Sequence, residues 1–235
     1  MEDQASALRA RASDVLKALK ESSASPPVFV EFSGSPKSGK STCIDIVAHF
    51  FRRMGYNVLA PTEGASKRTP YYLKTDWMAF NTWSACYALT HILEGLYHSD
   101  KYHLAILDRG LFDALVWFEL LASDGKITTD DRDKVHQFLL IDKWRSVTNC
   151  VFLFKADPGT SMNRENQDKL VSDSGTAMNP EVLAKLNSAY DATRERYANL
   201  FPDFEVIDTS DDMKTTAQST ALGVVDRILN LFPTG

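Results

Sequence analysis

The sequence predicts an α/β fold, in which a five-stranded parallel sheet carries helices on both faces and so forms three layers. Two observations predict it. Five short apolar runs alternate along the chain with longer segments in which apolar residues recur with helical period. Strands that alternate with helices form βαβ units, whose strands are parallel and buried on both faces. The first apolar run also leads directly into a glycine-bracketed turn and then into a helical segment.

The apolar runs are the expected strands. In chain order they are VFVEF (28–32), NVLA (57–60), HLAILD (103–108), CVFLFKA (150–156) and FEVIDTS (204–210). The expected helices lie between and after them, at 40–54, about 70–98, about 111–122, 131–145, 180–200 and 214–231. Parallel sheets bind their ligands at the carboxyl ends of the strands, so functional residues are expected there.

One more helix is expected before the first strand, over residues 5–21. The sequence ESSASPP ends it. Its apolar residues recur at helical spacing, and they are Leu8, Ala12, Val15, Leu16 and Leu19. We expect residues 1–25 to be a helical extension that packs on one domain formed by residues 26–235, because a chain of 235 residues can bury a sizeable core without splitting.

Composition limits the possible functions. With 44% apolar residues, 24% charged residues and a formal net charge of −5, the chain lacks the overall basic character that nucleic acids and membrane surfaces require of a partner.

Cys43, Cys86 and Cys150 are scattered and form no C-x-x-C pair, which favours buried thiols in a reducing compartment. No signal-peptide pattern and no apolar stretch of the ~18 residues that span a bilayer is present. The expected location is the cytoplasm.

The turn after the first expected strand fits the phosphate-loop template G-x-x-x-x-G-K-[ST] at Gly34–Ser41. Glycines let several backbone N–H groups face one point, and the following helix adds its positive N-terminal end. Lys40 is expected to reach the β- and γ-phosphates of ATP, and the Ser41 hydroxyl to hold Mg²⁺. The candidate ATP-binding residues are Gly34, Ser35, Pro36, Lys37, Ser38, Gly39, Lys40, Ser41 and Thr42.

The dipeptide Asp108-Arg109 ends the third expected strand, beside the phosphate loop. A carboxylate at this place can hold Mg²⁺ directly or through water. ATPases that hydrolyse their nucleotide usually follow this Asp with a water-activating Glu. Arg109 instead suits the binding of a substrate or of a phosphoryl group in transfer. The alternative is a strand-terminal Asp with a surface Arg as its partner.

The order of these motifs resembles the thymidylate kinase and deoxynucleoside kinase group of phosphate-loop kinases, over roughly residues 28–231. The resemblance implies the three-layer fold of phosphate-loop NTPases, with ATP as phosphoryl donor and Mg²⁺ as cofactor. In this group a carboxylate follows the second strand, where APTEGAS supplies Glu63. Members that phosphorylate nucleosides use such a Glu as the base for the 5′-hydroxyl, so the resemblance implies this role for Glu63. The alternative is a solvated loop acid.

The segment FNTWSACYAL (80–89) resembles the stretch in which deoxynucleoside kinases read and sandwich the base. By this resemblance Asn81 would pair with the base edge, since an amide offers both a donor and an acceptor. Aromatic residues at helical spacing would stack on the base, and they are Trp77, Phe80, Trp83 and Tyr87. The alternative is plain core or a dimer interface, and the group implies a homodimer through the helix at 75–98.

The segment 157–178 stands where the group has a mobile lid whose arginines close over the transferring phosphate. Arg164 is the matching residue, with Lys169 as a second candidate. Gly175 suits a hinge, and a surface cation paired with a neighbouring acid is the alternative for Arg164. The lid is poorer in arginine than in deoxynucleoside kinases, and Asp108-Arg109 is followed by Gly where they usually have Glu-Arg-Ser.

Two classes of function remain. The first is a kinase that transfers the γ-phosphoryl group to a nucleoside or a nucleoside monophosphate. The phosphate of a monophosphate could meet Lys67 and Arg68. The acceptor of such a kinase could also be a non-nucleoside small molecule or a modified base. The second is a nucleotide-dependent switch or NTPase. The chain lacks the N-K-x-D motif of GTPase switches, and Asp108 is followed by Arg109 rather than Glu. The kinase is therefore favoured.

Overall fold

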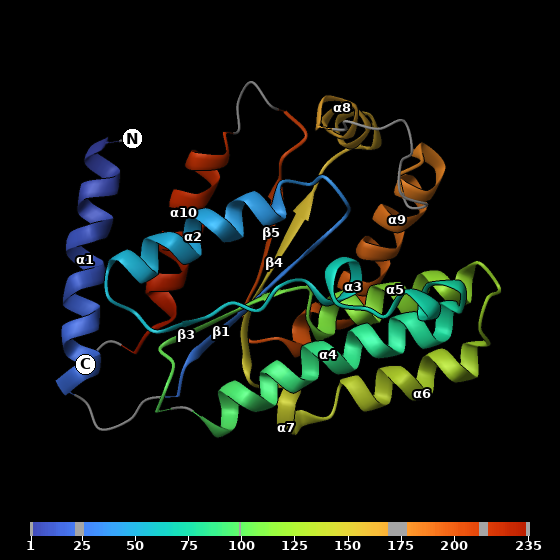
Figure 1. The fold of residues 1–235 in the computed structure, drawn as a ribbon, viewed down its shortest axis with the longest axis horizontal. Helices are drawn as coiled ribbons and strands as arrows, with labels where there is room; N and C mark the ends of the chain where they lie inside the picture. The colour runs from blue at the N-terminus through green and yellow to red at the C-terminus, as the bar shows by residue number, and fades with distance from the viewer. Residues whose placement is uncertain (1, 22–25, 99, 169–177, 212–215, 234–235) are drawn as a thin grey trace.

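The structure is a computed structural model that describes residues 2–21, 26–98, 100–168, 178–211 and 216–233. Its five strands form one all-parallel sheet in the order β2-β3-β1-β4-β5, which confirms the predicted fold class (Figure 1). The strands are β1 (Val28–Gly34), β2 (Val58–Leu59), β3 (Leu104–Asp108), β4 (Thr148–Lys155) and β5 (Phe204–Asp208). Each lies within, or overlaps, the apolar run predicted for it.

The helices lie between and after the strands. They are α1 (Glu2–Glu21), α2 (Lys40–Arg53), α3 (Gly64–Lys67), α4 (Trp77–Tyr97), α5 (Leu111–Ser123), α6 (Thr129–Leu139), α7 (Asp142–Arg145), α8 (Pro158–Asp168), α9 (Pro180–Tyr197) and α10 (Ala217–Leu231), with two short 3₁₀ helices, η1 (Tyr71–Thr75) and η2 (Ala198–Leu200). No helix in the described part of the chain combines the length and apolarity needed to cross a bilayer.

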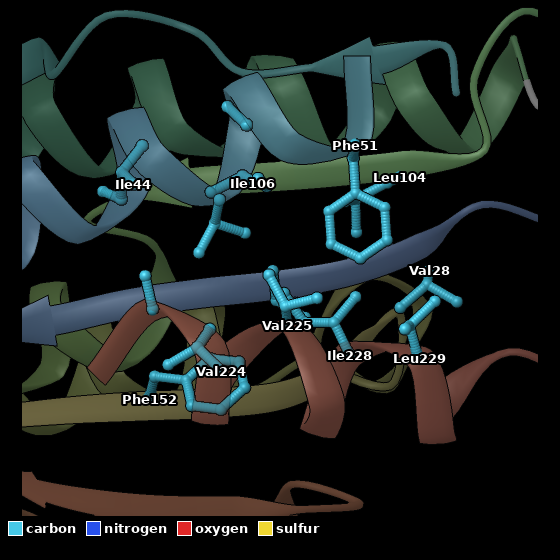
Figure 2. Packing of buried hydrophobic residues seen from close by; sticks show 14 of the residues in the cluster. Val28, Ile44, Phe51, Leu104, Ile106, Phe152, Val224, Val225, Ile228 and Leu229 are labelled. Carbon is cyan, nitrogen blue, oxygen red and sulfur yellow. The ribbon is translucent and has the colours of Figure 1, made fainter. Parts of the chain in front are cut away.

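Helices cover both faces of the sheet. Helices α1, α2 and α10 cover one face, and α4, α5 and α9 cover the other (Figure 1). Successive side chains of a strand point to opposite faces, so Val28, Val30 and Phe32 of β1 join the core under α2 and α10. Figure 2 shows this core, in which Ile44 and Phe51 of α2 and four residues of α10 pack around the strands.

The predicted extension at the N-terminus is part of this core. Leu8, Ala12 and Leu16 of α1 are buried in the same cluster as α2 and α10. The hydroxyl of Tyr56 donates a hydrogen bond of 2.8 Å to the carbonyl oxygen of Ala12. The predicted helix therefore forms, and its apolar stripe packs on the rest of the chain.

Two predicted helices are interrupted. The segment 70–98 was predicted as one helix, but η1 ends at Thr75 and α4 begins at Trp77, because the Asp76 carboxylate accepts the N–H of Ala79 and so caps a new helix. The segment 131–145 likewise splits into α6 and α7, with non-helical backbone at Ile141, where ψ is 126°. Helices α4 and α6 each begin at a short polar side chain that caps them, Asp76 and Thr128. Apolar periodicity does not show this local effect.

Two further helices were not predicted. The short helix α3 lies in the loop after β2, and α8 occupies the first part of the segment predicted as a lid. The carboxylate of Asp157 accepts the N–H of Thr160 at 2.9 Å and so stabilises the first turn of α8. Lys169 and Gly175 lie outside the described residues, so the second lid cation and the hinge stay predictions.

Candidate active site

The phosphate loop joins β1 to α2 and needs glycine at its first position. Gly34 has φ +145°, and a Cβ atom there would lie 2.2 Å from the carbonyl oxygen of Phe154 on the adjacent strand. Gly39, with φ +84°, is the residue before α2 and lets the loop enter the helix. Lys37 also has a positive φ, of 59°, which is uncommon for a residue other than glycine. The loop is therefore held in a strained, curled conformation.

Lys40, Ser41 and Asp108 meet at the carboxyl end of the sheet, as the sequence predicts. Phe32 of β1 is in register with Asp108 of β3, which brings the two strand ends together. The Lys40 ammonium lies 3.0 Å from Oδ1 of Asp108, and the Ser41 hydroxyl donates a hydrogen bond of 3.4 Å to Oδ2. Only 6% of the Lys40 side chain is exposed, so its charge faces the loop and this carboxylate.

The loop also buries polar atoms that lack partners. Among the described residues, the hydroxyl oxygens of Ser35 and Ser38 are buried without a hydrogen bond. A buried polar atom without a partner is costly. Both atoms lie in the loop whose backbone N–H groups the motif assigns to phosphate, and a phosphate chain would supply the missing acceptors.

Arg109 lies between two carboxylates. Its Nε donates to Oε1 of Glu63 at 2.6 Å, and its Nη1 donates to both oxygens of Asp113 at 3.0 and 2.9 Å. Burial lowers the pKa of Arg109, but the negative charges around it, led by that of Asp113, raise it well above the ordinary arginine value. The backbone of Arg109 has φ +67°, so this residue too is held in an uncommon conformation.

Three buried residues around the Arg109–Glu63 pair were not identified from the sequence. They are Tyr190, Asp113 and Glu31. The Tyr190 hydroxyl of α9 donates to Oδ1 of Asp113 and accepts the backbone N–H of Gly34 at 3.1 Å. The Glu31 carboxylate, wholly buried in β1, accepts the backbone N–H groups of Phe112 and Asp113 at 3.0 and 2.8 Å. Glu31 thus holds the first turn of α5, from which Asp113 projects.

Arg164 projects from α8 towards the phosphate loop. Its guanidinium donates to the carbonyl oxygen of Lys37 at 2.9 Å, and to the hydroxyl and carbonyl oxygens of Thr209 at 3.2 and 2.5 Å. The Lys37 ammonium lies 3.2 Å from the Glu165 carboxylate of the same helix. The predicted lid arginine therefore lies beside the phosphate loop and links it to the end of β5.

Two cavities meet at this edge of the sheet. The first, of about 650 Å³, is lined by the whole loop from Ser35 to Cys43 and by Arg164 and Thr209, and we call it the loop cavity. The second, of about 590 Å³, lies between α3, α4, α5 and the start of α9 and is lined mainly by apolar side chains, so we call it the aromatic cavity. Pro36, Glu63 and Arg109 line both.

The aromatic cavity contains most of the predicted acceptor residues. Trp77, Phe80 and Asn81 line it, with Tyr87. The Asn81 amide donates one hydrogen bond, of 2.8 Å, to the carbonyl oxygen of Trp77, and it makes no other with the described residues. Its oxygen and second N–H are therefore available to a ligand in the cavity.

Two predicted acceptor residues lie elsewhere. Trp83 does not line the aromatic cavity but stacks on Tyr87, with ring centroids 5.2 Å apart. Arg68 is exposed at the end of α3 and is not among the residues that line either cavity. Lys74 and Lys126 also line the aromatic cavity, and the Lys126 ammonium lies 3.9 Å from the centre of the Trp77 ring.

The fold is similar to that of solved deoxyadenosine kinase structures. The chain is similar to deoxyadenosine kinase from M. mycoides. Its structure with the products dCMP and a flexible dCDP matches with TM-score 0.59 and 18% identity, over 86% of this chain and 99% of that one. The structures with dCTP and with dATP match with TM-scores 0.56 and 0.58 and 19% identity, again over 86% of this chain and 99% and 100% of theirs. No protein-family model and no curated protein sequence matches the chain.

A sequence signal for one of the missed residues does exist. Asp113 is the only acid in the first turn of α5, an otherwise apolar helix, and it stands four residues after Arg109. Arg109 stands two residues before this helix begins, and its side chain reaches the acid in the first turn, so the spacing indicates an ion pair. Tyr190 gives no such signal, since it lies 77 residues from Asp113 in the sequence.

Proposed function

We propose that the protein is a kinase that transfers the γ-phosphoryl group of ATP to a hydroxyl group of a nucleoside. The observation that carries this proposal is the junction of the two cavities at Glu63 and Arg109. Phosphoryl transfer needs little covalent chemistry from a protein, and depends on positioning donor and acceptor in line and on stabilising the charge between them. A carboxylate and a cation lie at the junction of the phosphate site and the acceptor site. The carboxylate can position the acceptor hydroxyl, and the cation can stabilise the charge on the group in transfer.

ATP binds in the loop cavity. Its phosphates lie on the backbone of Gly34–Ser41, with the Lys40 ammonium on the β- and γ-phosphates. Lys40 is buried beside Asp108, so its charge is screened little by water. Arg164 and Lys37 add positive charge to the same cavity.

Mg²⁺ fits the residues that lie there. The Ser41 hydroxyl and the Asp108 carboxylate are hard oxygen ligands, they are within 3.4 Å of one another, and Mg²⁺ in such sites takes one or two protein ligands besides phosphates and waters. Mg²⁺ held there would neutralise charge on the phosphate chain of ATP. Ser41 and Asp108 would hold it.

The acceptor lies in the aromatic cavity. Its hydroxyl group faces Glu63, which takes the proton as the oxygen attacks the γ-phosphorus and the bond to the β-phosphate oxygen breaks, giving ADP and a phosphate monoester. Arg109 stabilises the charge that develops on the transferring group. The base stacks between Trp77 and Phe80, and its edge pairs with Asn81.

The geometry favours a nucleoside over a nucleoside monophosphate. Glu63 is a carboxylate at the cavity junction. It can accept the proton of a hydroxyl acceptor, whereas its negative charge would repel an acceptor phosphate. Arg68, the residue proposed for the 5′-phosphate, lies outside the lining of both cavities. The likeness to deoxyadenosine kinase from M. mycoides, whose solved structures hold deoxynucleotides, supports an acceptor of this class.

The proposal is tested by measuring ADP release from ATP and Mg²⁺ with each of the common nucleosides and deoxynucleosides, with their monophosphates, and with no acceptor. At least one nucleoside should raise ADP release well above the rate without acceptor. Lys40→Ala should abolish the rise, whereas Lys143→Ala, which removes a cation of α7 away from both cavities, should keep it. ADP release that is equal with and without every acceptor would favour the NTPase alternative.

A further inference from the structure

Tyr190 is a buried tyrosine at the centre of the site that belongs to none of its motifs. It projects from the middle of α9, and its side chain is completely buried. Its hydroxyl lies within hydrogen-bonding distance of three groups: the N–H of Gly34 in β1, the carboxylate of Asp113 in α5, and Nη1 of Arg109 in the turn between β3 and α5, the last at 3.5 Å. A fully buried hydroxyl usually has one or two partners.

These contacts form one continuous chain across the site. It runs from the backbone of Gly34 in the phosphate loop to Tyr190, then to Asp113, then to Arg109 and finally to Glu63. Among the described residues this is a direct side-chain connection between the donor loop and the predicted base, and every link is a hydrogen bond or an ion pair between buried or half-buried groups.

The direction of the hydrogen bonds in this chain is defined. Burial, and next the charge of Asp113, raise the pKa of Tyr190 well above its ordinary value, so its hydroxyl keeps its proton. The hydroxyl therefore donates to Asp113 and accepts the N–H of Gly34. Asp113, which is 2% exposed, has the negative charge that Arg109 needs in this buried place.

Both ends of this series of contacts have positive φ values, 145° at Gly34 and 67° at Arg109. Glycine adopts such a value readily, whereas the backbone of Arg109 is strained and persists in this conformation only where the surroundings hold it. At one end the N–H of Gly34 donates to the Tyr190 hydroxyl at 3.1 Å and, at the longer distance of 3.5 Å, to Oδ1 of Asp113. At the other end the Asp113 carboxylate holds the guanidinium of Arg109.

We propose that Tyr190 and Asp113 are positioning residues that couple the conformation of the phosphate loop to that of the Arg109–Glu63 pair. Neither is assigned a role in proton or phosphoryl transfer: Asp113 acts through Arg109, and Tyr190 acts through Asp113 and Gly34. The effect that we expect of substitutions at Tyr190 and Asp113 on turnover rests on the proposed function. Their expected effect on nucleotide binding does not depend on the acceptor.

The test compares two matched substitutions on the same helix. Tyr190→Phe removes one buried hydroxyl of α9, and Tyr197→Phe removes another, which bonds to His136 at 3.0 Å and lines neither cavity. ADP affinity is measured for both by calorimetry with Mg²⁺, with no acceptor present. Tyr190→Phe should weaken ADP binding about five- to tenfold, the worth of roughly one hydrogen bond, and Tyr197→Phe should leave it unchanged.

Turnover is measured next, with whichever nucleoside the wild type accepts. Tyr190→Phe should lower kcat about tenfold with a smaller change in the acceptor KM, because alignment and not acceptor binding is lost. Asp113→Asn should lower kcat further, and the double variant should be no worse than Asp113→Asn alone, since both act through one chain. Melting temperatures of all variants are recorded to confirm that they fold.

Equal ADP affinity in the two Phe variants, both folded, would overturn the inference, and so would additive effects of Tyr190→Phe and Asp113→Asn on kcat. If the wild type transferred phosphate to no acceptor, the proposed function would fail. The ADP-binding comparison would still decide the role of Tyr190.

Discussion

Arg109 Nε lies 2.6 Å from Oε1 of Glu63, although the two residues are 46 positions apart in the sequence. The same guanidinium contacts both oxygens of Asp113, so one half-buried cation is shared by two carboxylates. This arrangement fixes Glu63 at the edge where the loop cavity meets the aromatic cavity.

Glu63→Gln and Asp108→Asn should have different effects. Glu63→Gln keeps the shape of the side chain but removes the base, so kcat should fall roughly 10²- to 10⁴-fold while the Mg²⁺ concentration for half-maximal rate stays unchanged. Asp108→Asn removes a proposed Mg²⁺ ligand beside Ser41 and should raise that concentration. Titrations of rate against Mg²⁺ distinguish the two. An equal shift in both variants would contradict the separate roles.

Asn81→Leu should change which base is accepted. The amide edge that Asn81 presents to the aromatic cavity would be lost, and the polar atoms of a bound base would be buried without partners, at a cost of about 1–3 kcal/mol each. kcat/KM for the preferred nucleoside should fall roughly ten- to a hundredfold, while the affinity for ADP stays the same. An unchanged ranking of nucleosides, with only the melting temperature lowered, would show that Asn81 is a core residue.

Gly34→Ala should unfold or inactivate the protein. The new Cβ would overlap the carbonyl oxygen of Phe154, at 2.2 Å, and φ would remain in the left-handed region, so we expect a loss of about 3 kcal/mol or more in the free energy of unfolding. Gly223→Ala is the matched control, because Gly223 lies in α10 with no atom within 4 Å of the added methyl group. It should stabilise the protein by about 0.5–1 kcal/mol. Urea titrations of both variants measure the difference.

His136 should make the protein less stable in acid. Its ring is 2% exposed and lies between the Tyr197 hydroxyl and the Leu115 carbonyl oxygen, and burial lowers its pKa below 6.5 despite the hydrogen bond to Leu115, which acts to raise it. As the pH falls below 6.5, the unfolded chain takes up a proton at this residue while the folded protein does not, so stability falls.

His136→Asn removes this titration. Urea unfolding should therefore show a smaller loss of stability for the variant than for the wild type between about pH 7 and about pH 5. Parallel curves for the two proteins over this range would contradict the assignment.

The sequence predicts those parts of the site that depend on local pattern. The phosphate loop, the strand before it and the helix after it follow from a glycine spacing and two apolar periods, and Asp108-Arg109 follows because parallel strands end at one edge. Glu63, Trp77, Phe80 and Asn81 were assigned by family resemblance, and the structure places them around one cavity.

The rest depends on contacts between distant segments. The Tyr190 hydroxyl meets Gly34 only after five parallel strands and α9 have packed, and no spacing in the sequence encodes that contact. The separate starts of α4 and α6 depend on the capping side chains of Asp76 and Thr128, each of which accepts one backbone N–H. Apolar periodicity cannot show such effects, because it records which face is buried and not where backbone hydrogen bonds begin.

If Glu63 and Arg109 direct the γ-phosphoryl group to a hydroxyl of a nucleoside, ³¹P NMR will detect the product. The reaction contains the protein, ATP, Mg²⁺ and the best nucleoside of the panel. A phosphate monoester resonance should grow in equal amount with ADP, and Glu63→Gln should slow its growth greatly. ADP accompanied by inorganic phosphate, with no monoester, would contradict transfer to a nucleoside.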